Sequence, residues 1–343
     1  MSEFRRDPFT GRWRILAEGR AARPNQYGGP PAAQATAEDC PFCEGHEDRT
    51  PPEEAAVRPA GLPPNGPGWT VRSFPNKFPS VAPETRLEGP AVVPPFERGP
   101  GRGFHEVIVE APAHAPDLPY LSDEQAHTLF RFLRDRVRAL SARPGIGNVL
   151  LFENRGPESG GTLPHPHAQI MATEPRPARI DEEVEAFRRG NLFGGDGCRL
   201  EAVVDAERRQ RSRIVGEGPE FVAFAPFASE YPYEVWFVPR RHARSFVDAS
   251  DREVDALARC LPAVLRAIDR QRGIVSYNWF VHGHLPTPGS WDRFHWHLEV
   301  APRLVRADGY ELGSGVAVNP VAPERVAEEL RPLVATAFGG QQP

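Results

Sequence analysis

Two stretches of the chain carry apolar residues at helical spacing, and each one begins with a capping signal. Ser122 precedes the first stretch with Gln125 three residues on, and Ser250 precedes the second with Glu253. A serine followed three residues later by Gln or Glu is typical of a helix N-terminus. The apolar positions recur every three or four residues, as Ala126, Leu129, Phe130, Leu133, Val137 and Leu140 in the first stretch and as Val254, Leu257, Leu261, Val264, Leu265 and Ile268 in the second. This spacing predicts two amphipathic helices.

Short apolar runs bounded by turn residues flank both helices and predict strands. These runs cover residues 13–16, 104–111, 149–152, 233–238, 275–280 and 295–300. The two halves repeat one order of elements: a strand, a histidine (His114 or His242), a capped helix, a second strand and a His-x-His pair. Residues 1–199 and 200–343 are therefore predicted to be two tandem copies of one α+β unit, with mostly antiparallel sheets and flanking helices.

The segment Pro164-His165-Pro166-His167-Ala168-Gln169 gathers the most reactive side chains of the first half. If it is extended, His165 and His167 point to the same face, because side chains at i and i+2 share one side of a strand. The two prolines restrict the backbone and stiffen the loop. Such a pair suits a metal ligand beside a nucleophile, although an isolated His-x-His can also be a pair on a solvent-facing strand.

Cys40 and Cys43 are separated by two residues on a turn, which brings two thiolates within reach of one zinc ion. With His114 and His165 they can complete a tetrahedral, closed, structural zinc site. A redox cysteine pair is the alternative, but no βαβ pattern surrounds this one. The other cysteines, Cys198 and Cys260, lack a Cys-x-x-Cys partner and are interpreted as packing residues.

A closed zinc site leaves His167 outside the ligand set, as a candidate nucleophile toward phosphorus. Gln169 follows two residues later and can donate an amide hydrogen bond to the charge that develops on a phosphoryl group. Backbone N–H groups of Gly160, Gly161 and Thr162 can approach a phosphate closely.

A second group of histidines, His282, His284, His295 and His297, clusters in the C-terminal half. We expect His282, His295 and His297 to bind a second metal ion, with Glu182 or Glu183 as the fourth ligand. The alternative is that the strand histidines face solvent.

The composition describes an ordinary soluble protein of 343 residues, with 40% hydrophobic and 25% charged residues. The net charge of -5 offers no basic field for nucleic acid. No apolar run marks a signal peptide or a membrane span, and four cysteines make no disulfide scaffold, so we expect a cytoplasmic protein. Among 41 Lys and Arg residues only Lys77 is lysine, and it either survives by chance or serves a site that needs a compact ammonium group.

These motifs resemble the galactose-1-phosphate uridylyltransferase family of the histidine-triad (HIT) superfamily. The resemblance runs nearly end to end and is carried by residues 5–13, 20–24, 40–43, 75–76, 113–114, 152–156, 165–169 and 294–300. It is most specific in Phe152-Glu153-Asn154-Arg155-Gly156 together with His165-Pro166-His167-x-Gln169. Ala168 departs from the glycine of the best-known members, and the tail at 309–315 is similar to a divergent short branch that includes adenylyl-transferring enzymes.

The resemblance implies two tandem HIT-like units and a covalent nucleotidyl-histidine intermediate on His167, with Gln169 stabilising the phosphoryl group. It implies zinc on Cys40, Cys43, His114 and His165, and a second metal, iron or zinc, on Glu183, His282, His295 and His297. The substrate contacts would be Arg23, Asn76, Asn154, Gly160 and Thr162, joined by Lys77 and Gly161 from the residue pattern.

The sequence leads to three functional hypotheses. The first is a uridylyltransferase that exchanges UDP-glucose and galactose 1-phosphate for UDP-galactose and glucose 1-phosphate. The second is an ADP-sugar phosphorylase or adenylyltransferase of the same superfamily, and the third is a zinc protein that binds nucleotides without catalysis. The expected partners of the enzyme are a nucleotide sugar, a sugar 1-phosphate and a second copy of the chain in a homodimer, with no nucleic acid and no membrane.

Overall fold

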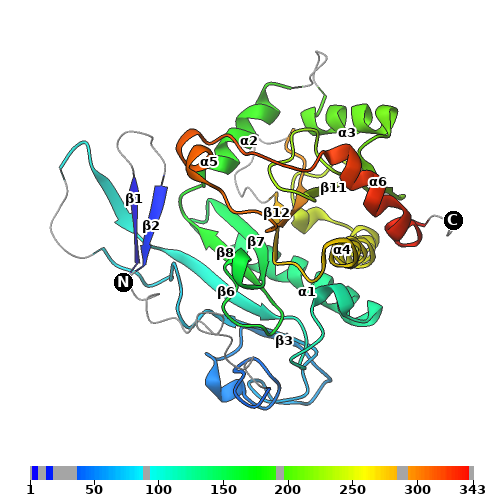
Figure 1. Cartoon of the computed structure of the whole chain (residues 1–343). Helices are drawn as coiled ribbons and strands as arrows, with labels where there is room; N and C mark the ends of the chain where they lie inside the picture. Colours follow the sequence, from blue (N-terminus) through cyan, green and yellow to red (C-terminus); the bar gives the residue numbers. More distant parts are fainter. Residues whose placement is uncertain are drawn as a thin grey trace.

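The computed structural model describes residues 2–6, 13–17, 37–87, 93–190, 197–283 and 293–339. Within these ranges the strands form two antiparallel sheets, a small one in the order β2-β1-β5 and a ten-stranded one in the order β3-β4-β6-β8-β7-β12-β13-β11-β10-β9 (Figure 1). The strands are β1 (Ser2–Arg6), β2 (Trp13–Ala17), β3 (Ala55–Val57), β4 (Val71–Pro75), β5 (Glu97–Pro100), β6 (Gly103–Val109), β7 (Asn148–Arg155), β8 (His167–Thr173), β9 (Ile214–Glu217), β10 (Phe221–Phe224), β11 (Val235–Pro239), β12 (Tyr277–His282) and β13 (His297–Pro302). The helices are α1 (Asp123–Ser141), α2 (Ala178–Arg188), α3 (Arg199–Gln210), α4 (Asp251–Arg272), α5 (Gly309–Ser314) and α6 (Pro323–Val334).

The order of strands in the large sheet repeats itself about its centre. The first half contributes β4-β6-β8-β7 and the second contributes β12-β13-β11-β10, and β7 pairs with β12 where the halves meet. The predicted antiparallel α+β architecture is thus confirmed. The division at residues 199 and 200 stays a prediction, and the sheet runs without a break from one half into the other.

One face of the large sheet is covered by α1, α4 and α6. The two long helices lie side by side (Figure 1) and bury Leu129, Leu133, Leu257 and Leu261 in one apolar core with the sheet. Each such side chain removed from water contributes roughly 1.5–3 kcal/mol. Helix α6 packs on α4 and β9 and closes the far end of this core.

The opposite face is covered differently in the two halves. In the first half the loop around Cys40 and Phe42 packs over Trp69 and Phe74. In the second half α2 and α3 pack over β9, β10 and β11 through a separate apolar cluster that includes Phe187 and Leu200. This face, with a cysteine-bearing loop on one side and two helices on the other, holds the reactive residues of both halves.

The two predicted helix starts are observed, with one difference. Ser250 and Glu253 form a complete capping box at α4, whereas at α1 only the Ser122 side chain caps, accepting from the backbone N–H of Gln125. The Gln125 side chain donates instead to the carbonyl oxygens of Thr70 and Glu110, and these hydrogen bonds connect two neighbouring segments to the start of the helix.

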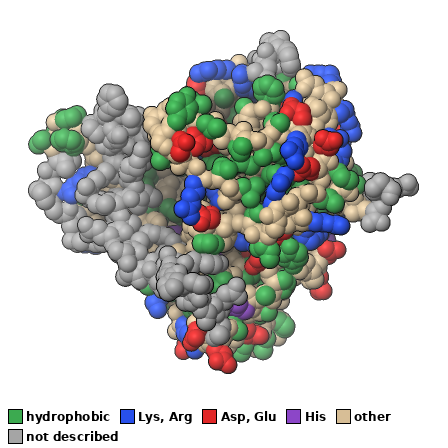
Figure 2. Space-filling model, viewed as in Figure 1, with side chains coloured by type: hydrophobic (Ala, Val, Ile, Leu, Met, Phe, Trp, Pro, Cys, Tyr) green, Lys and Arg blue, Asp and Glu red, His purple; other side chains and the backbone are tan. Residues whose placement is uncertain are grey.

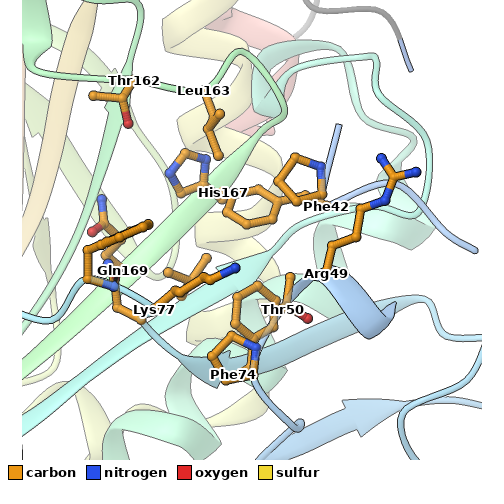
Figure 3. A pocket seen from close by; sticks show the side chains of 14 residues that line it. Phe42, Arg49, Thr50, Phe74, Lys77, Thr162, Leu163, His167 and Gln169 are labelled. Atoms are coloured by element: carbon orange, nitrogen blue, oxygen red, sulfur yellow. Dashed lines mark hydrogen bonds between the residues drawn. The ribbon is translucent and has the colours of Figure 1, made fainter. Parts of the chain in front are cut away.

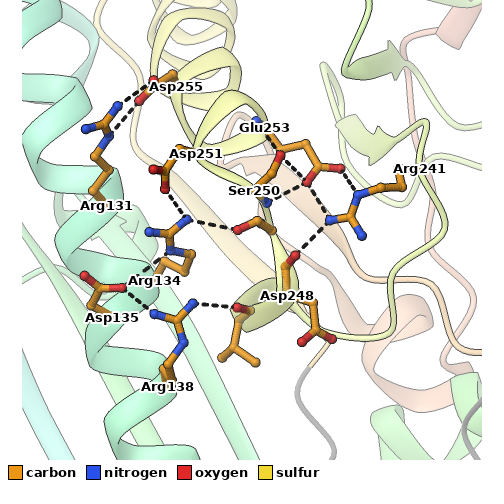
Figure 4. A network of polar contacts seen from close by, with 12 residues as sticks. Arg131, Arg134, Asp135, Arg138, Arg241, Asp248, Ser250, Asp251, Glu253 and Asp255 are labelled. Carbon is orange, nitrogen blue, oxygen red and sulfur yellow. Dashed lines mark hydrogen bonds and ion pairs between the residues drawn. The ribbon is translucent and has the colours of Figure 1, made fainter.

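A polar network joins α1 to the first turn of α4 (Figure 4). Arg131 forms a bidentate ion pair with Asp255, and Arg134 reaches Asp251 and the carbonyl oxygen of Ala249. Exposed ion pairs contribute little energy each, about 0–1 kcal/mol, so this network orients the helices more than it stabilises them.

The described part of the surface in Figure 2 mixes acidic and basic side chains without a broad basic area. No helix in the described ranges is both long enough and apolar enough to cross a membrane.

Candidate functional site

The four expected zinc ligands converge. Cys40, Cys43, His114 and His165 each offer one ligand atom, and these atoms all lie within 4.8 Å of one another. The Nδ1 atom of His165 lies 3.4 Å from the sulfur of Cys40 and 3.6 Å from that of Cys43, and His114 Nδ1 lies 3.5 Å from the Cys43 sulfur. Tetrahedral zinc with ordinary Zn–S and Zn–N bonds separates its ligand atoms by about 3.5 Å. The geometry therefore fits a zinc ion.

The ring of His165 is held in the tautomer that a metal needs. Its Nε2 donates to the carbonyl oxygen of Ala111 at 2.9 Å, which leaves Nδ1 unprotonated and facing the two sulfurs. Burial lowers the pKa of His165 to about 3, so the ring stays neutral. Burial and the neighbouring Cys40 raise the pKa of the Cys43 thiol to about 12. A bound cation would favour the thiolate instead.

His167 begins strand β8 and is only 5% exposed. Its Nδ1 donates to the carbonyl oxygen of His165 at 2.7 Å. In the neutral ring Nε2 is then the unprotonated nitrogen, which carries the nucleophilic lone pair. The ring of Phe42 lies edge-on to His167, with 5.1 Å between the ring centroids, and limits how the imidazole can turn.

His167 lines a cavity of about 180 Å³ on the sheet face covered by the Cys40 loop. Its walls are largely apolar, from Phe42, Phe74 and Val107, while Asn76, Lys77, Thr162 and Gln169 supply polar groups. Figure 3 shows Lys77 reaching across the pocket toward Phe42, with His167 above it. A slot with apolar walls and a few convergent polar groups is the usual form of a site for a small organic ligand.

Gln169 is oriented by His105 of the neighbouring strand β6. The Nδ1 atom of His105 accepts from the backbone N–H of Ser80 at 3.1 Å, so the neutral ring carries its proton on Nε2. His105 Nε2 lies 3.0 Å from Gln169 Oε1 and therefore donates to it. The amide nitrogen of Gln169 is left to donate toward the cavity. The sequence did not indicate this role for His105, which lies within the strand predicted at residues 104–111.

The glycine loop before the motif behaves differently from the prediction. The N–H of Gly160 donates to the carbonyl oxygen of Pro157, and that of Gly161 donates to Gly156, both at 3.1 Å. These two N–H groups close the turn and are not presented to a phosphate, so that expectation was wrong. A side chain at Gly161 would lie 2.7 Å from the Gly156 carbonyl oxygen, so the turn requires glycine there. Thr162 does line the cavity.

The remaining predicted substrate contacts fall in three places. Asn76 and Lys77 line the cavity. Asn154 stands on β7 and accepts from the side chain of Asn278 on β12 at 2.6 Å, which places it where the two halves of the sheet meet. Arg23 lies outside the described residues, as does His284.

The second metal cluster contains three of the four expected residues. Glu183, His282, His297 and Glu299 bring their ligand atoms together, and His295 lies elsewhere. The structure brings Glu299 to this cluster from the position two residues after His297 on β13, and it groups His295 with other residues, so His295 as a ligand of this metal stays a prediction. Two buried atoms of this cluster, His297 Nε2 and Glu299 Oε1, lie 3.3 Å apart and have no hydrogen-bond partner among the described residues. Such a donor set fits a divalent cation.

His295 belongs to a third cluster, with Cys198 and His242. Its Nδ1 lies 3.8 Å from the Cys198 sulfur, and Glu201 Oε1 lies 3.3 Å from His242 Nδ1. Cys198 packs in the apolar cluster beneath α2 and α3, as predicted, and its sulfur also faces this group of possible metal ligands. The signal was present in the sequence, because Cys198-x-x-Glu201 has the spacing of Cys40-x-x-Cys43. A carboxylate is a zinc ligand as well, so the missing second cysteine was no reason to dismiss the pair.

Two buried carboxyl groups lie behind the reactive strand. Glu153 of β7 pairs in register with Ala168, between His167 and Gln169, and accepts from Tyr277 and Trp279. Burial raises the pKa of Glu153 to about 8. Glu110 is fully buried, and within the described part of the chain neither of its oxygens has a hydrogen-bond partner. Burial and the Glu153 charge raise the pKa of Glu110 well above the usual range.

Comparison with known proteins agrees with this geometry. The N-terminal domain of galactose-1-phosphate uridyl transferase matches residues 1–177. The chain belongs to the galactose-1-phosphate uridyl transferase family. A family member from Streptomyces lividans, a galactose-1-phosphate uridylyltransferase, is 30% identical over 96% of this chain and 86% of its own length.

Relatives with two different activities lie at similar distances within the family. ADP-glucose phosphorylase from Arabidopsis thaliana is 29% identical over 97% of this chain and 93% of its own length. Galactose-1-phosphate uridylyltransferase from Thermotoga maritima is also 29% identical, over 96% and 98%. A solved uridylyltransferase superposes with a TM-score of 0.78 at 28% identity, covering 98% of this chain and 99% of that one. The Arabidopsis phosphorylase with bound ADP-glucose gives 0.72 at 27%, covering 96% and 99%. These relatives support nucleotidyl transfer on sugar phosphates as the chemistry.

Proposed function

We propose that the protein is a nucleotidyltransferase that works by double displacement through a covalent intermediate on His167. The observation that carries the proposal is the arrangement of two side chains in one cavity. The Nε2 atom of His167 is the nucleophile, because Nδ1 carries the proton donated to the His165 carbonyl, and Gln169 directs its amide nitrogen into the same cavity.

In the first step, the Nε2 lone pair of His167 attacks the α-phosphorus of a nucleotide sugar. A P–N bond forms, the P–O bond to the β-phosphate breaks, and the electron pair leaves with the sugar 1-phosphate. Gln169 donates hydrogen bonds to the phosphoryl oxygens as their charge develops. The hydrogen bond from Nδ1 to the His165 carbonyl stabilises the ring while it carries the phosphoryl group. A second sugar phosphate then attacks phosphorus, and the electrons of the P–N bond return to Nε2.

Cys40, Cys43, His114 and His165 would hold a structural zinc ion, which fixes the loop carrying Phe42 against the strand that starts at His167. All four positions of that site are filled by the protein, so its role is to place His167 and not to bind substrate. The second cluster, with Glu183, His282, His297 and Glu299, would hold iron or zinc away from the cavity lined by His167.

Our leading substrate assignment is UDP-glucose as donor and galactose 1-phosphate as acceptor. Asn76, Lys77, Asn154 and Thr162 would contact the nucleotide, and Arg23 its phosphates. We propose a cytoplasmic homodimer. The second assignment is an ADP-sugar phosphorylase, with inorganic phosphate as acceptor, and the similarity to the Arabidopsis enzyme supports it.

The test is intact-protein mass spectrometry after mixing the protein with UDP-glucose, and separately with ADP-glucose, without an acceptor. A uridylyl-sized increment supports the uridylyltransferase, and an adenylyl-sized increment supports the phosphorylase. The increment must be absent in His167→Gly. It must persist in His127→Ala, which changes a histidine of α1 on the other face of the sheet. No increment from either donor would overturn the covalent mechanism with these sugars and favour a non-catalytic binding protein.

A further inference from the structure

A second cavity is lined by residues of α2, α3 and β11, which are labelled in Figure 1, and by His297. Its volume of about 200 Å³ is close to that of the cavity at His167. Phe187, Leu200, Val203 and Trp236 make its walls apolar, and His297 lines its inner end. Glu183 and His297 belong both to the lining and to the candidate metal cluster, and the proposed nucleotidyl transfer at His167 does not use this cavity.

The strand register shows that this cavity occupies the place of the first one in the other half. On β8, Gln169 pairs with Val107 of β6, and on β13 the corresponding Glu299 pairs with Trp236 of β11. Val107 lines the first cavity and Trp236 lines the second. The two cavities are therefore built on equivalent positions of a repeated sheet.

The histidines at the two inner ends correspond as well. His167 donates from Nδ1 to the carbonyl oxygen of His165 at 2.7 Å, and His297 Nδ1 lies 3.1 Å from the carbonyl oxygen of His295. In each half the earlier histidine of the pair belongs to a candidate metal cluster with a cysteine. His297 thus stands at the position of the proposed nucleophile.

The loops that cover the two cavities also match. Phe42 follows Cys40 by two residues and lines the first cavity, and Leu200 follows Cys198 by two residues and lines the second. The Cys40 sulfur lies 3.4 Å from His165 Nδ1 and the Cys198 sulfur lies 3.8 Å from His295 Nδ1, so each cysteine faces the histidine beside its own cavity, although Cys198 precedes residue 200. Three walls of the second cavity therefore have a counterpart in the first.

From this correspondence we infer that the C-terminal cavity is a second nucleotide-binding pocket, which holds the base of a nucleoside monophosphate without reacting with it. The indole of Trp236 is partly exposed and stacks on the ring of His297, with 5.1 Å between the ring centroids, and a base can extend this stack. Stacking of a base on an aromatic side chain contributes about 1–3 kcal/mol. Arg199 lines the same cavity and can meet the phosphate.

One substitution explains why this pocket does not transfer nucleotidyl groups. Glu299 stands where the first half has Gln169 and pairs with Arg179 at 2.7 Å, and a carboxylate, unlike an amide, offers no hydrogen bond to a phosphoryl oxygen. The Nε2 atom of His297 lies 3.3 Å from Oε1 of Glu299. In the N-terminal half the corresponding residue is Gln169, whose amide lines the first cavity. The pocket therefore provides binding without catalysis, as expected of a site that senses nucleotide.

The test counts nucleotide sites by equilibrium dialysis of the full chain with AMP and, separately, with UMP. We expect two sites per chain with at least one of them. Val203→Trp fills the second pocket and should leave one site, together with an unchanged covalent adduct on His167. Val107→Trp gives the first pocket the tryptophan that the second pocket has at the equivalent position, Trp236. Only the C-terminal site should then remain. Melting temperature and zinc content of each variant report whether it is folded.

A second readout does not depend on cavity-filling variants. AMP or UMP bound in this pocket should quench the fluorescence of Trp236, and the quench should disappear in Trp236→Phe. A single site per chain that is lost in Val107→Trp, or two sites that persist in Val203→Trp, would overturn the inference. The absence of a covalent adduct on His167 would count against the proposed reaction and not against this pocket, because the two readouts are separate.

Discussion

His105 donates a hydrogen bond from Nε2 to Oε1 of Gln169 at 3.0 Å, and the N–H of Ser80 holds the other nitrogen of its ring. This chain of contacts decides which end of the Gln169 amide faces the cavity. An amide that could turn over would present oxygen to a phosphoryl group half of the time. His105 is therefore a positioning residue for the proposed phosphoryl donor.

Gln169→Glu should lower the rate of nucleotidyl transfer by about 10²–10³-fold, the usual effect of losing one donor to a developing oxyanion. The substitution copies Glu299, the residue of the non-reacting half. Rapid-quench measurement of adduct formation gives the rate. His127→Ala changes a residue of α1 on the other face of the sheet, so it serves as the control and should keep the rate.

His105→Phe should lower kcat by roughly tenfold with little change in KM, because the donor remains but loses its orientation. His105→Gln can still donate to Gln169 and should recover part of the loss. An equal effect of both variants on KM alone would contradict the positioning role.

Removing a metal ligand should reduce both metal content and stability. Cys43→Ser is expected to lose one zinc per chain and to lower the melting temperature, since a structural zinc contributes to folding directly. His282→Ala should reduce the metal of the cluster formed by Glu183, His282, His297 and Glu299, and it should leave the N-terminal zinc in place. Elemental analysis by mass spectrometry, with thermal melts, measures both effects.

Cys260→Ser is the matched control for these variants. Cys260 is equally buried but lies outside the three candidate metal clusters and donates to the carbonyl oxygen of Ala337. It should keep the full metal content. Loss of metal in this variant would mean that the content reports general unfolding.

Glu153 predicts a dependence of stability on pH. Its folded pKa of about 8 lies above the value near 4.3 of an unfolded glutamate, so folding takes up a proton between these values. The stabilisation is fully present below about pH 4.3 and is lost as the pH rises through 8. Glu153→Gln removes the titration and should flatten the slope by at most about 1.4 kcal/mol per pH unit.

Urea unfolding at several pH values between 5 and 8 measures this slope. Glu124→Gln, on the exposed side of the first turn of α1, is the matched control and should leave the slope unchanged. Glu110→Gln should also flatten it, because burial and the Glu153 charge raise the pKa of Glu110. Equal slopes in the wild type and both buried variants would show that these carboxyl groups do not take up the proton.

Lys77 predicts a contribution to substrate binding. Its side chain crosses the mouth of the cavity (Figure 3) and is exposed, so the charge is screened and its effect should be modest. Lys77→Met should raise KM for the nucleotide sugar by about three- to tenfold, and Lys77→Arg should keep most of the affinity. Unchanged KM in Lys77→Met would leave chance retention of the lysine as the explanation. Initial-rate kinetics with the donor varied give these values.

The sequence by itself determined the repeated order of elements, the two capped helices and the four residues of the N-terminal candidate metal cluster. These are local properties. A helix start depends on residues three apart, such as Ser250 and Glu253. Cysteine and histidine are the side chains that zinc prefers, so a Cys-x-x-Cys pair with His114 and His165 leaves few other combinations of ligands.

Only the tertiary structure decided which groups meet across strands. His105 reaches Gln169 because β6 and β8 pair in one register, and Glu299 joins a candidate metal cluster because it lies two residues after His297 on β13. A shift of one residue in register would turn every side chain of a strand to the opposite face of the sheet. The hydrophobic pattern of each strand does not specify which residues of two strands pair. The correspondence of the two cavities depends on the same kind of pairing, since the register of β11 with β13 is what makes Trp236 equivalent to Val107.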